Sequence, residues 1–154
     1  MKKIISLALV LVMALALASC GAFSIFGDVA EEGDVTVVVE TADGSFEIYE
    51  TSLESVENKE EGVKGVLENL CDREENPLHL VTDATNFVTE IGSIKQDAAS
   101  SAYVMIYTSL ESDSYAGAPT VQYEGMTLYQ SGFGIGDMTV KAGSVIFFRL
   151  EVYE

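Results

Sequence analysis

The sequence predicts an α+β domain in which one helix packs across a mixed sheet. Two patterns carry this prediction. From Asp34 onward, most segments alternate apolar and polar residues with the period of a half-buried strand. One segment, at about residues 59–72, instead repeats its apolar residues with the helical period. Because this helix follows the first two of about eight short strands, we expect it to lie across a mixed sheet.

The first two strands are predicted as a hairpin over residues 34–50. The first strand directs three valines to one face: Val35, Val37 and Val39. The turn at residues 42–44, Ala-Asp-Gly, uses residue types that favour tight turns. The second strand is predicted to direct Phe46 and Ile48 inward and Glu47 outward. We therefore expect the inner face of this hairpin to be apolar.

The helix is predicted from four apolar residues that share one stripe. They are Val63, Val66, Leu67 and Leu70. Asn58 followed by Glu61 resembles a capping box, which predicts that the helix begins near residue 59, and Pro77 lies beyond its end. Gly65 costs the helix about 1 kcal/mol relative to alanine, and we expect it to allow a close approach between the helix and the sheet.

Six further segments complete the predicted set of strands. They are Leu78–Thr82, Phe87–Ile94, Tyr103–Leu110, Val121–Tyr123, Met126–Tyr129 and Ser144–Tyr153. The turn at residues 124–125, Glu-Gly, joins two of them in a tight hairpin. The last strand alternates most clearly. Arg149 and Glu151 share one face, and the other face is apolar, with Ile146, Phe148, Leu150 and Val152.

The N-terminus predicts export and lipid attachment. Two lysines precede an apolar stretch, Ile4–Leu17, which has the features of a secretory signal. This stretch is shorter than the roughly 20 apolar residues that a membrane-spanning helix needs. It ends in Leu-Ala-Ser-Cys at residues 17–20, a motif that resembles the lipobox of bacterial lipoproteins. The alternative is an ordinary signal cleavage, in which Cys20 carries no lipid.

These features divide the chain into three parts. We expect a lipoprotein signal peptide at residues 1–19, a lipidated tether at residues 20–33 and a folded domain at residues 34–154. Cys20 would carry palmitate or a similar acyl chain and hold the domain at the outer side of the cell membrane. Cys71 would then stand alone and form no intramolecular disulfide.

The charge of the chain excludes two classes of partner. The formal net charge is −17, and removal of the signal peptide leaves six basic residues against 25 acidic ones. Such a surface repels nucleic acid and anionic lipid headgroups. We therefore expect no nucleic-acid partner and a membrane attachment that depends on the acyl chains.

The reactive residues argue against catalysis and against a metal site. The chain has one histidine, His79, and Cys71 is the one cysteine outside the lipobox. They could form a nucleophile–base pair, but Cys71 follows Leu70 and is more typical of a cysteine at the edge of the core. Zinc needs three or four nitrogen or sulfur ligands, which this chain lacks. We expect no catalytic residue, although a carboxylate pair among the acids stays an alternative.

Two connections that contain glycine also carry aromatic residues. They are Ser112–Pro119 and Gly132–Gly136. The second lacks the spacing of a phosphate-binding loop and precedes no predicted helix, so we expect a flexible aromatic loop there. Aromatic residues on such loops suit the binding of large flat ligands or of proteins, and they are equally typical of ordinary hairpin connections.

Four segments carry a resemblance to a known family: Gly62–Leu70, Asn86–Ile94, Tyr103–Tyr107 and Ile135–Phe147. Through them, residues 34–153 resemble the transcobalamin-like C-terminal domain family, which occurs in bacterial surface proteins and as the small domain of cobalamin carriers. The chain departs from the family in having no tryptophan and in having Gly-Ser where the family usually has Gly-Asp. The resemblance implies a β-grasp-like fold.

The resemblance also implies a ligand, namely cobalamin or a related corrinoid. Four aromatic residues are then the candidates for its binding surface: Tyr115, Tyr123, Tyr129 and Phe133. Because one small domain covers a single face of a corrin, we expect weak binding or binding shared with a partner such as a transporter. His79 could ligate cobalt, although a histidine beside Pro77 is more typical of a solvent-facing strand. The alternative function is a structural or adhesive surface module that binds a protein or the cell wall.

Overall fold

The computed structural model describes residues 32–153 and contains one α-helix and nine strands in that range. In chain order they are β1 (Asp34–Glu40), β2 (Phe46–Ser52), α2 (Val63–Cys71), β3 (Leu80–Thr82), β4 (Val88–Ile91), β5 (Ile94–Lys95), β6 (Ala102–Thr108), β7 (Thr120–Tyr123), β8 (Met126–Gln130) and β9 (Val145–Val152). The predicted signal peptide (1–19), Cys20 and nearly all of the predicted tether (20–33) lie outside the described residues.

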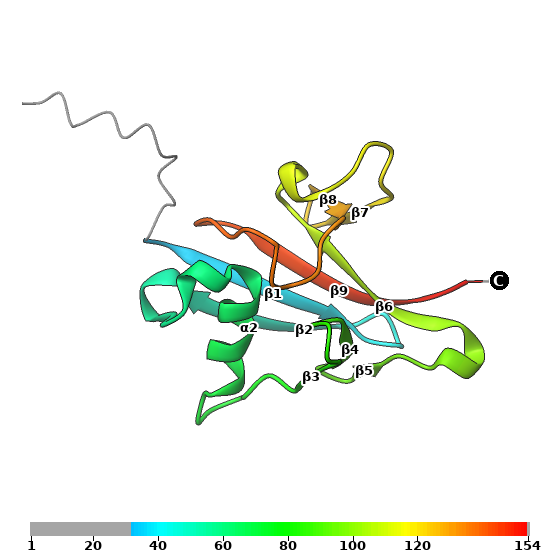
Figure 1. Ribbon diagram of the computed structural model, residues 1–154, viewed down its shortest axis with the longest axis horizontal. Helices are drawn as coiled ribbons and strands as arrows, with labels where there is room; N and C mark the ends of the chain where they lie inside the picture. The colour runs from blue at the N-terminus through cyan, green and yellow to red at the C-terminus, as the bar shows by residue number, and fades with distance from the viewer. Residues whose placement is uncertain (1–31, 154) are drawn as a thin grey trace, which may run out of the picture.

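The main sheet has six strands in the order β2-β1-β9-β6-β8-β7. β9, the last strand, runs parallel to β1, while the other neighbours in this sheet are antiparallel. A second, smaller sheet has the order β3-β4-β5, and α2 lies near β1 and β2 (Figure 1). A hairpin, one helix and a final strand inserted beside the first form a β-grasp-like arrangement, so the predicted α+β fold is confirmed.

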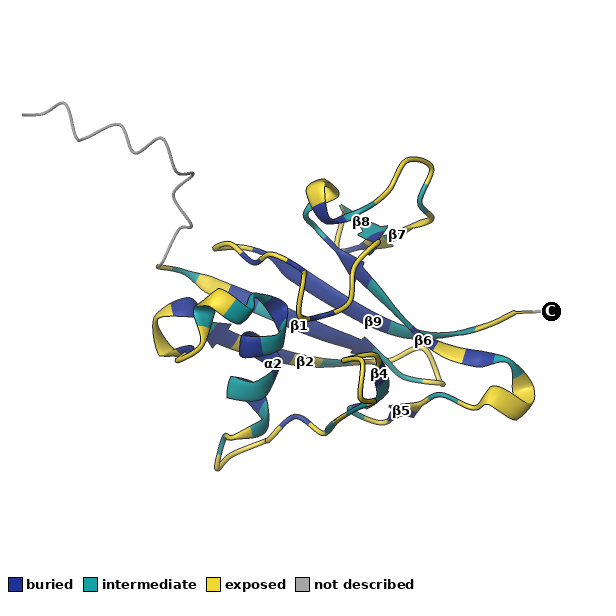
Figure 2. Ribbon diagram, viewed as in Figure 1, coloured by how far each residue is buried: buried dark blue, intermediate teal, exposed yellow. Residues whose placement is uncertain are grey.

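The larger core lies between the main sheet, α2 and the small sheet. As predicted, Val35, Val37 and Val39 of β1 share this core with the four apolar residues of the helical stripe. Ile146 and Phe148 of β9 are fully buried there. Figure 2 shows that many buried residues lie along β1 and β9, two interior strands of the sheet. Burial of side chains of this size is the main favourable contribution to the stability of such a domain.

The opposite face of the sheet carries a second core, which corrects one prediction. Phe46 and Ile48 are each 48% exposed and do not point into the larger core; Tyr49 and Thr51 are buried instead. The register of the hairpin explains the difference, because Tyr49 pairs with Val37 and Ile48 pairs with Val38, and directly opposed residues project to the same face. The second core consists of Val38, Tyr107, Tyr123, Leu128, Val145 and Phe147.

The helix begins later than predicted. A 3-10 helix spans Lys59–Glu61, Gly62 then adopts a positive φ of 58°, and α2 starts at Val63. Asn58 makes no capping hydrogen bond with its side chain, so the predicted capping box is wrong. The first helical N–H groups are satisfied from another segment, since Val63 N–H donates to the carbonyl of Met138 at 3.2 Å.

The close approach expected at Gly65 exists, but its partner is not the sheet. A Cβ at this position would lie 2.2 Å from the carbonyl oxygen of Asn58. Gly65 therefore lets the preceding 3-10 helix fold back against α2.

The remaining strands agree with prediction except for one division. The predicted segment Phe87–Ile94 is split into β4 and β5 by a turn, where Gly92 has a φ of 53°. Glu124 and Gly125 both have positive φ, as expected for the tight hairpin turn between β7 and β8.

Within residues 32–153, no helix has the length and apolar character that a membrane span requires.

Candidate ligand-binding site

Two exposed phenylalanines face one hollow of about 240 Å³ on the surface. Phe87 precedes β4 and is 45% exposed, and Phe133 follows β8 and is 48% exposed. Strand β6 contributes Val104, Met105 and Ile106 to the lining. Polar groups at the same hollow come from Asn86 and Ser131. The hollow is therefore mainly apolar with a few hydrogen-bonding groups, which is the usual composition of a small-molecule site.

A turn held by Asp83 positions Phe87. The Asp83 carboxylate accepts hydrogen bonds from the hydroxyl of Thr85 at 2.7 Å and from the N–H of Phe87 at 3.0 Å. These bonds favour the charged carboxylate, so the pKa of Asp83 is lowered, first by the Thr85 hydroxyl and then by the Phe87 N–H. Asn86, immediately before Phe87, adopts a φ of 62°, which its short polar side chain tolerates.

Phe133 is held through its main chain. Its N–H donates to the Ser131 hydroxyl oxygen at 3.0 Å, and that hydroxyl donates to the carbonyl of Phe133 at 3.0 Å. Two residues later, Ile135 is 1% exposed and belongs to the larger core. The segment 132–136, predicted as a flexible aromatic loop, thus contributes Ile135 to the core and leaves Phe133 exposed.

Tyr115 and Tyr129 lie together at a neighbouring hollow of about 280 Å³. Tyr115 is half-exposed, and its hydroxyl donates to the side-chain oxygen of Gln130 at 2.7 Å. Its ring lies beside Gly132, where a Cβ would be 3.4 Å from the Tyr115 Cδ1 atom. Gly132 also lines the phenylalanine hollow, whereas the lining of that hollow includes neither Tyr115 nor Tyr129.

Tyr123 offers no exposed aromatic surface to a ligand. It is 8% exposed and belongs to the second core, where its ring meets Phe46 edge-on with centroids 5.4 Å apart. The structure therefore places Tyr115 and Tyr129 at one hollow and Phe133 at another, and it buries Tyr123. It adds Phe87, which the sequence pattern placed at the start of a predicted strand and not among the candidate binding residues. Its position after an Asp-Ala-Thr-Asn turn was the available signal.

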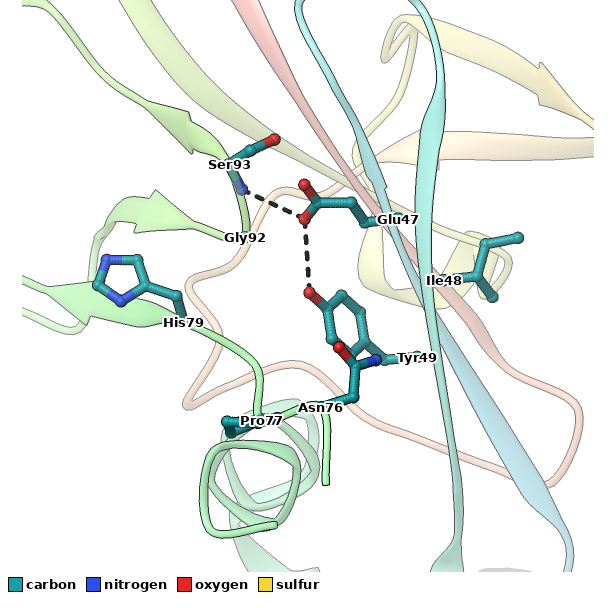
Figure 3. A pocket seen from close by; sticks show the side chains of 8 residues that line it. All are labelled: Glu47, Ile48, Tyr49, Asn76, Pro77, His79, Gly92 and Ser93. Carbon is teal, nitrogen blue, oxygen red and sulfur yellow. Dashed lines mark hydrogen bonds between the residues drawn. The ribbon is translucent and has the colours of Figure 1, made fainter. Parts of the chain in front are cut away.

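A larger and more polar cavity, of about 510 Å³, lies between β2 and the segment that leads into β3. Figure 3 shows its lining residues, which include Glu47, Tyr49, Asn76 and His79. One Glu47 carboxylate oxygen, Oε2, accepts hydrogen bonds from the Tyr49 hydroxyl at 3.4 Å and from the N–H of Ser93 at 3.2 Å. Burial, and then the negative charge of Glu47, raise the pKa of Tyr49.

Cys71 and His79 have different surroundings. Cys71 is half-buried against the larger core, and burial raises the pKa of its thiol, with Asp72 and Glu68 adding to the effect. His79 is exposed, and its Nε2 atom lies 3.3 Å from a carboxylate oxygen of Glu90. Within residues 32–153, no group of three or more histidine, cysteine, aspartate or glutamate side chains is arranged to hold a metal ion.

Comparison with known proteins identifies the fold and leaves the family open. No family model and no curated protein matches the sequence. Among solved structures, a candidate metal-binding protein from Ruminococcus gnavus matches with a TM-score of 0.52 and 17% identity, over 80% of this chain and all of the other. Haptocorrin in complex with Cbi matches with a TM-score of 0.52 and 13% identity, over 88% of this chain. The chain spans 29% of haptocorrin's length. At these identities the comparisons establish a shared fold, and that fold agrees with the resemblance to the transcobalamin-like family.

Proposed function

We propose that this protein is a non-enzymatic binding domain, anchored by lipid outside the cytoplasmic membrane, that holds one face of a large and partly apolar small molecule. The observation that carries the proposal is the hollow of Phe87 and Phe133. Two segments far apart in the sequence each present a phenylalanine ring, nearly half exposed, to the same depression. When a ligand covers aromatic side chains that are exposed together in this way, their burial contributes favourably to the free energy of binding.

The chemistry of the hollow suits a flat ligand with an apolar face and a hydrogen-bonding rim. The Asn86 amide and the Ser131 hydroxyl stand at an otherwise apolar depression. A corrinoid has a broad apolar face with amides around its edge, and it is the ligand that the family resemblance implies. The fold shared with haptocorrin, which was crystallised with Cbi, supports this choice of ligand class.

The small volume of the site indicates modest affinity. A hollow of about 240 Å³ lies below the usual range of roughly 300–1,000 Å³ for sites that enclose a drug-sized ligand. The domain would cover one face of a corrin and leave the other face to solvent or to a second protein. We propose that this second protein is a surface or transport protein that receives the ligand.

The acidity of the domain adds a selection by charge. The formal net charge is −17, so the surface repels anionic ligands and attracts cationic ones. Neutral ligands are unaffected by this charge. A ligand held mainly through apolar contact is compatible with this field.

Titration of the purified protein with cobalamin, followed by calorimetry, tests the proposal. Replacing Phe133 with alanine should weaken binding about tenfold, because each aromatic contact of this kind contributes roughly 1 kcal/mol or more. Replacing Phe87 should have a similar effect. The matched control is Phe46→Ala, since Phe46 is equally exposed but lies on the opposite face of the sheet.

Two results would contradict the proposal. One is the absence of binding at millimolar cobalamin while circular dichroism shows a folded domain, which would favour a structural or adhesive module with a protein or cell-wall partner. The other is an equal loss of affinity in all three variants, which would indicate a general effect on stability and no contact with the ligand at Phe87 or Phe133.

A further inference from the structure

β2 forms one edge of the main sheet, and its outward main-chain groups can be assigned from the hydrogen bonds of its neighbours. The N–H of Thr36 donates to Ser144 next to β9, so Thr36 and its partner Glu50 do not bond to each other. The main-chain groups of Glu50 therefore point away from β1, and its carbonyl accepts a hydrogen bond from Arg73. Because this direction alternates along a strand, the N–H and C=O of Ile48 also point outward.

Ile48 presents these groups to the polar cavity. It lines the cavity, yet its side chain points away from the other lining residues (Figure 3). No residue in the range 32–153 forms a main-chain hydrogen bond with Ile48 on the outward side. An exposed edge with free donors and acceptors is a template for another strand.

The same cavity holds a carboxylate, that of Glu47, with one oxygen free to accept further hydrogen bonds. Glu47 employs Oε2 for the Tyr49 hydroxyl and the Ser93 N–H, whereas its second oxygen, Oε1, bonds to no described residue. Gly92 makes room for this arrangement, because a Cβ there would lie 2.1 Å from Glu47 Oε2. The rings of Tyr49 and Pro77 provide apolar walls in the same cavity.

From these observations we propose that the β2 edge binds an extended segment of a partner protein, which pairs with the main chain of Ile48 and places a lysine or arginine side chain in the cavity against Glu47. Addition of a strand to a sheet edge is an established mode of peptide recognition, in which main-chain hydrogen bonds provide affinity and pockets for alternate side chains provide specificity.

The geometry of strands places the basic side chain on the correct face. Side chains alternate between the two faces of a sheet, so the residues on either side of the one opposite Ile48 project to the same face as Glu47 and Tyr49. A lysine at such a position would pack its methylene groups along the apolar walls and donate to the free Oε1.

Charge selects this occupant over a second copy of the chain. Each copy carries a formal net charge of −17, so pairing of two β2 edges would bring like charges together. A segment with a basic residue instead complements both Glu47 and the overall field. This surface shares no lining residue with the phenylalanine hollow, so it is independent of the proposed small-molecule function.

Binding of two synthetic peptides to the full-length protein tests the proposal. Both peptides alternate threonine and valine over seven residues, and they differ in a central lysine or a central glutamate. We expect the lysine peptide to bind at least about tenfold more tightly, as measured by fluorescence anisotropy, because it alone forms a charge-assisted hydrogen bond. Glu47→Gln should remove most of this preference. The control Glu54→Gln, an exposed glutamate outside the cavity, should retain it.

Amide hydrogen exchange distinguishes strand addition from simple binding of a cation. The proposal expects the Ile48 amide to exchange at least about tenfold more slowly with the lysine peptide bound, since the new hydrogen bond protects it. Unchanged exchange at Ile48 would overturn the strand pairing even if the peptide binds. Equal affinity for the two peptides, or equal effects of the two glutamine substitutions, would overturn the role of Glu47.

Discussion

Replacing Cys20 with serine should abolish covalent attachment of fatty acid to this protein. The reason is that Cys20 ends the Leu-Ala-Ser-Cys motif behind the apolar stretch Ile4–Leu17, and its thiol is the group to which the lipid would be attached. Cells expressing the tagged protein can be fed an alkyne-bearing palmitate, and the label on the purified chain measured by fluorescence after coupling. We expect a loss of more than about nine-tenths of the label, because the chain offers one acceptor at this motif.

Cys71→Ser is the matched control for this experiment. Cys71 is half-buried, and its thiol has a raised pKa because of burial, so it is a poor nucleophile and should not accept lipid. Label that persists in the Cys20 variant, or that disappears in the Cys71 variant, would contradict lipid anchoring through Cys20.

Replacing Gly62 with alanine should destabilise the domain by about 3 kcal/mol or more, which is among the largest effects expected for a single substitution. Gly62 has a φ of 58° and ψ of −128° immediately before α2, a conformation that residues with a Cβ rarely adopt. An added Cβ would also lie 2.0 Å from the carbonyl oxygen of Met138. That carbonyl accepts the first N–H of the helix, from Val63, so relief of the clash would break a capping interaction.

The variant Gly44→Ala separates the cost of a positive φ from the cost of a steric clash. Gly44 has a φ of 81°, but no atom of the described residues would lie within 4 Å of a Cβ added at that position. We expect this variant to lose about 1 kcal/mol, the cost of a positive φ alone. Urea unfolding followed by circular dichroism measures both values. Equal losses for the two variants would show that close packing against Met138 does not matter for stability.

The elements of this fold could be predicted because their signals are local. The alternation in β1 and β9 and the helical stripe of α2 depend on the directions of neighbouring side chains along one segment. The start of α2 could not be predicted in the same way. Its N–H groups are capped by the carbonyl of Met138, and a contact between residues so far apart in sequence leaves no pattern near Asn58.

The candidate site shows the same division. The sequence by itself determined that aromatic residues cluster on the connections of the second half, and Tyr115 and Phe133 are indeed exposed there. Only the tertiary structure decided that Tyr123 is buried, because the orientation of β2 places Phe46 over its ring. It also decided that Phe87 and Phe133 line one hollow. Composition and local spacing determine which side chains are available, whereas the pairing of distant strands determines which of them meet and which of them solvent can reach.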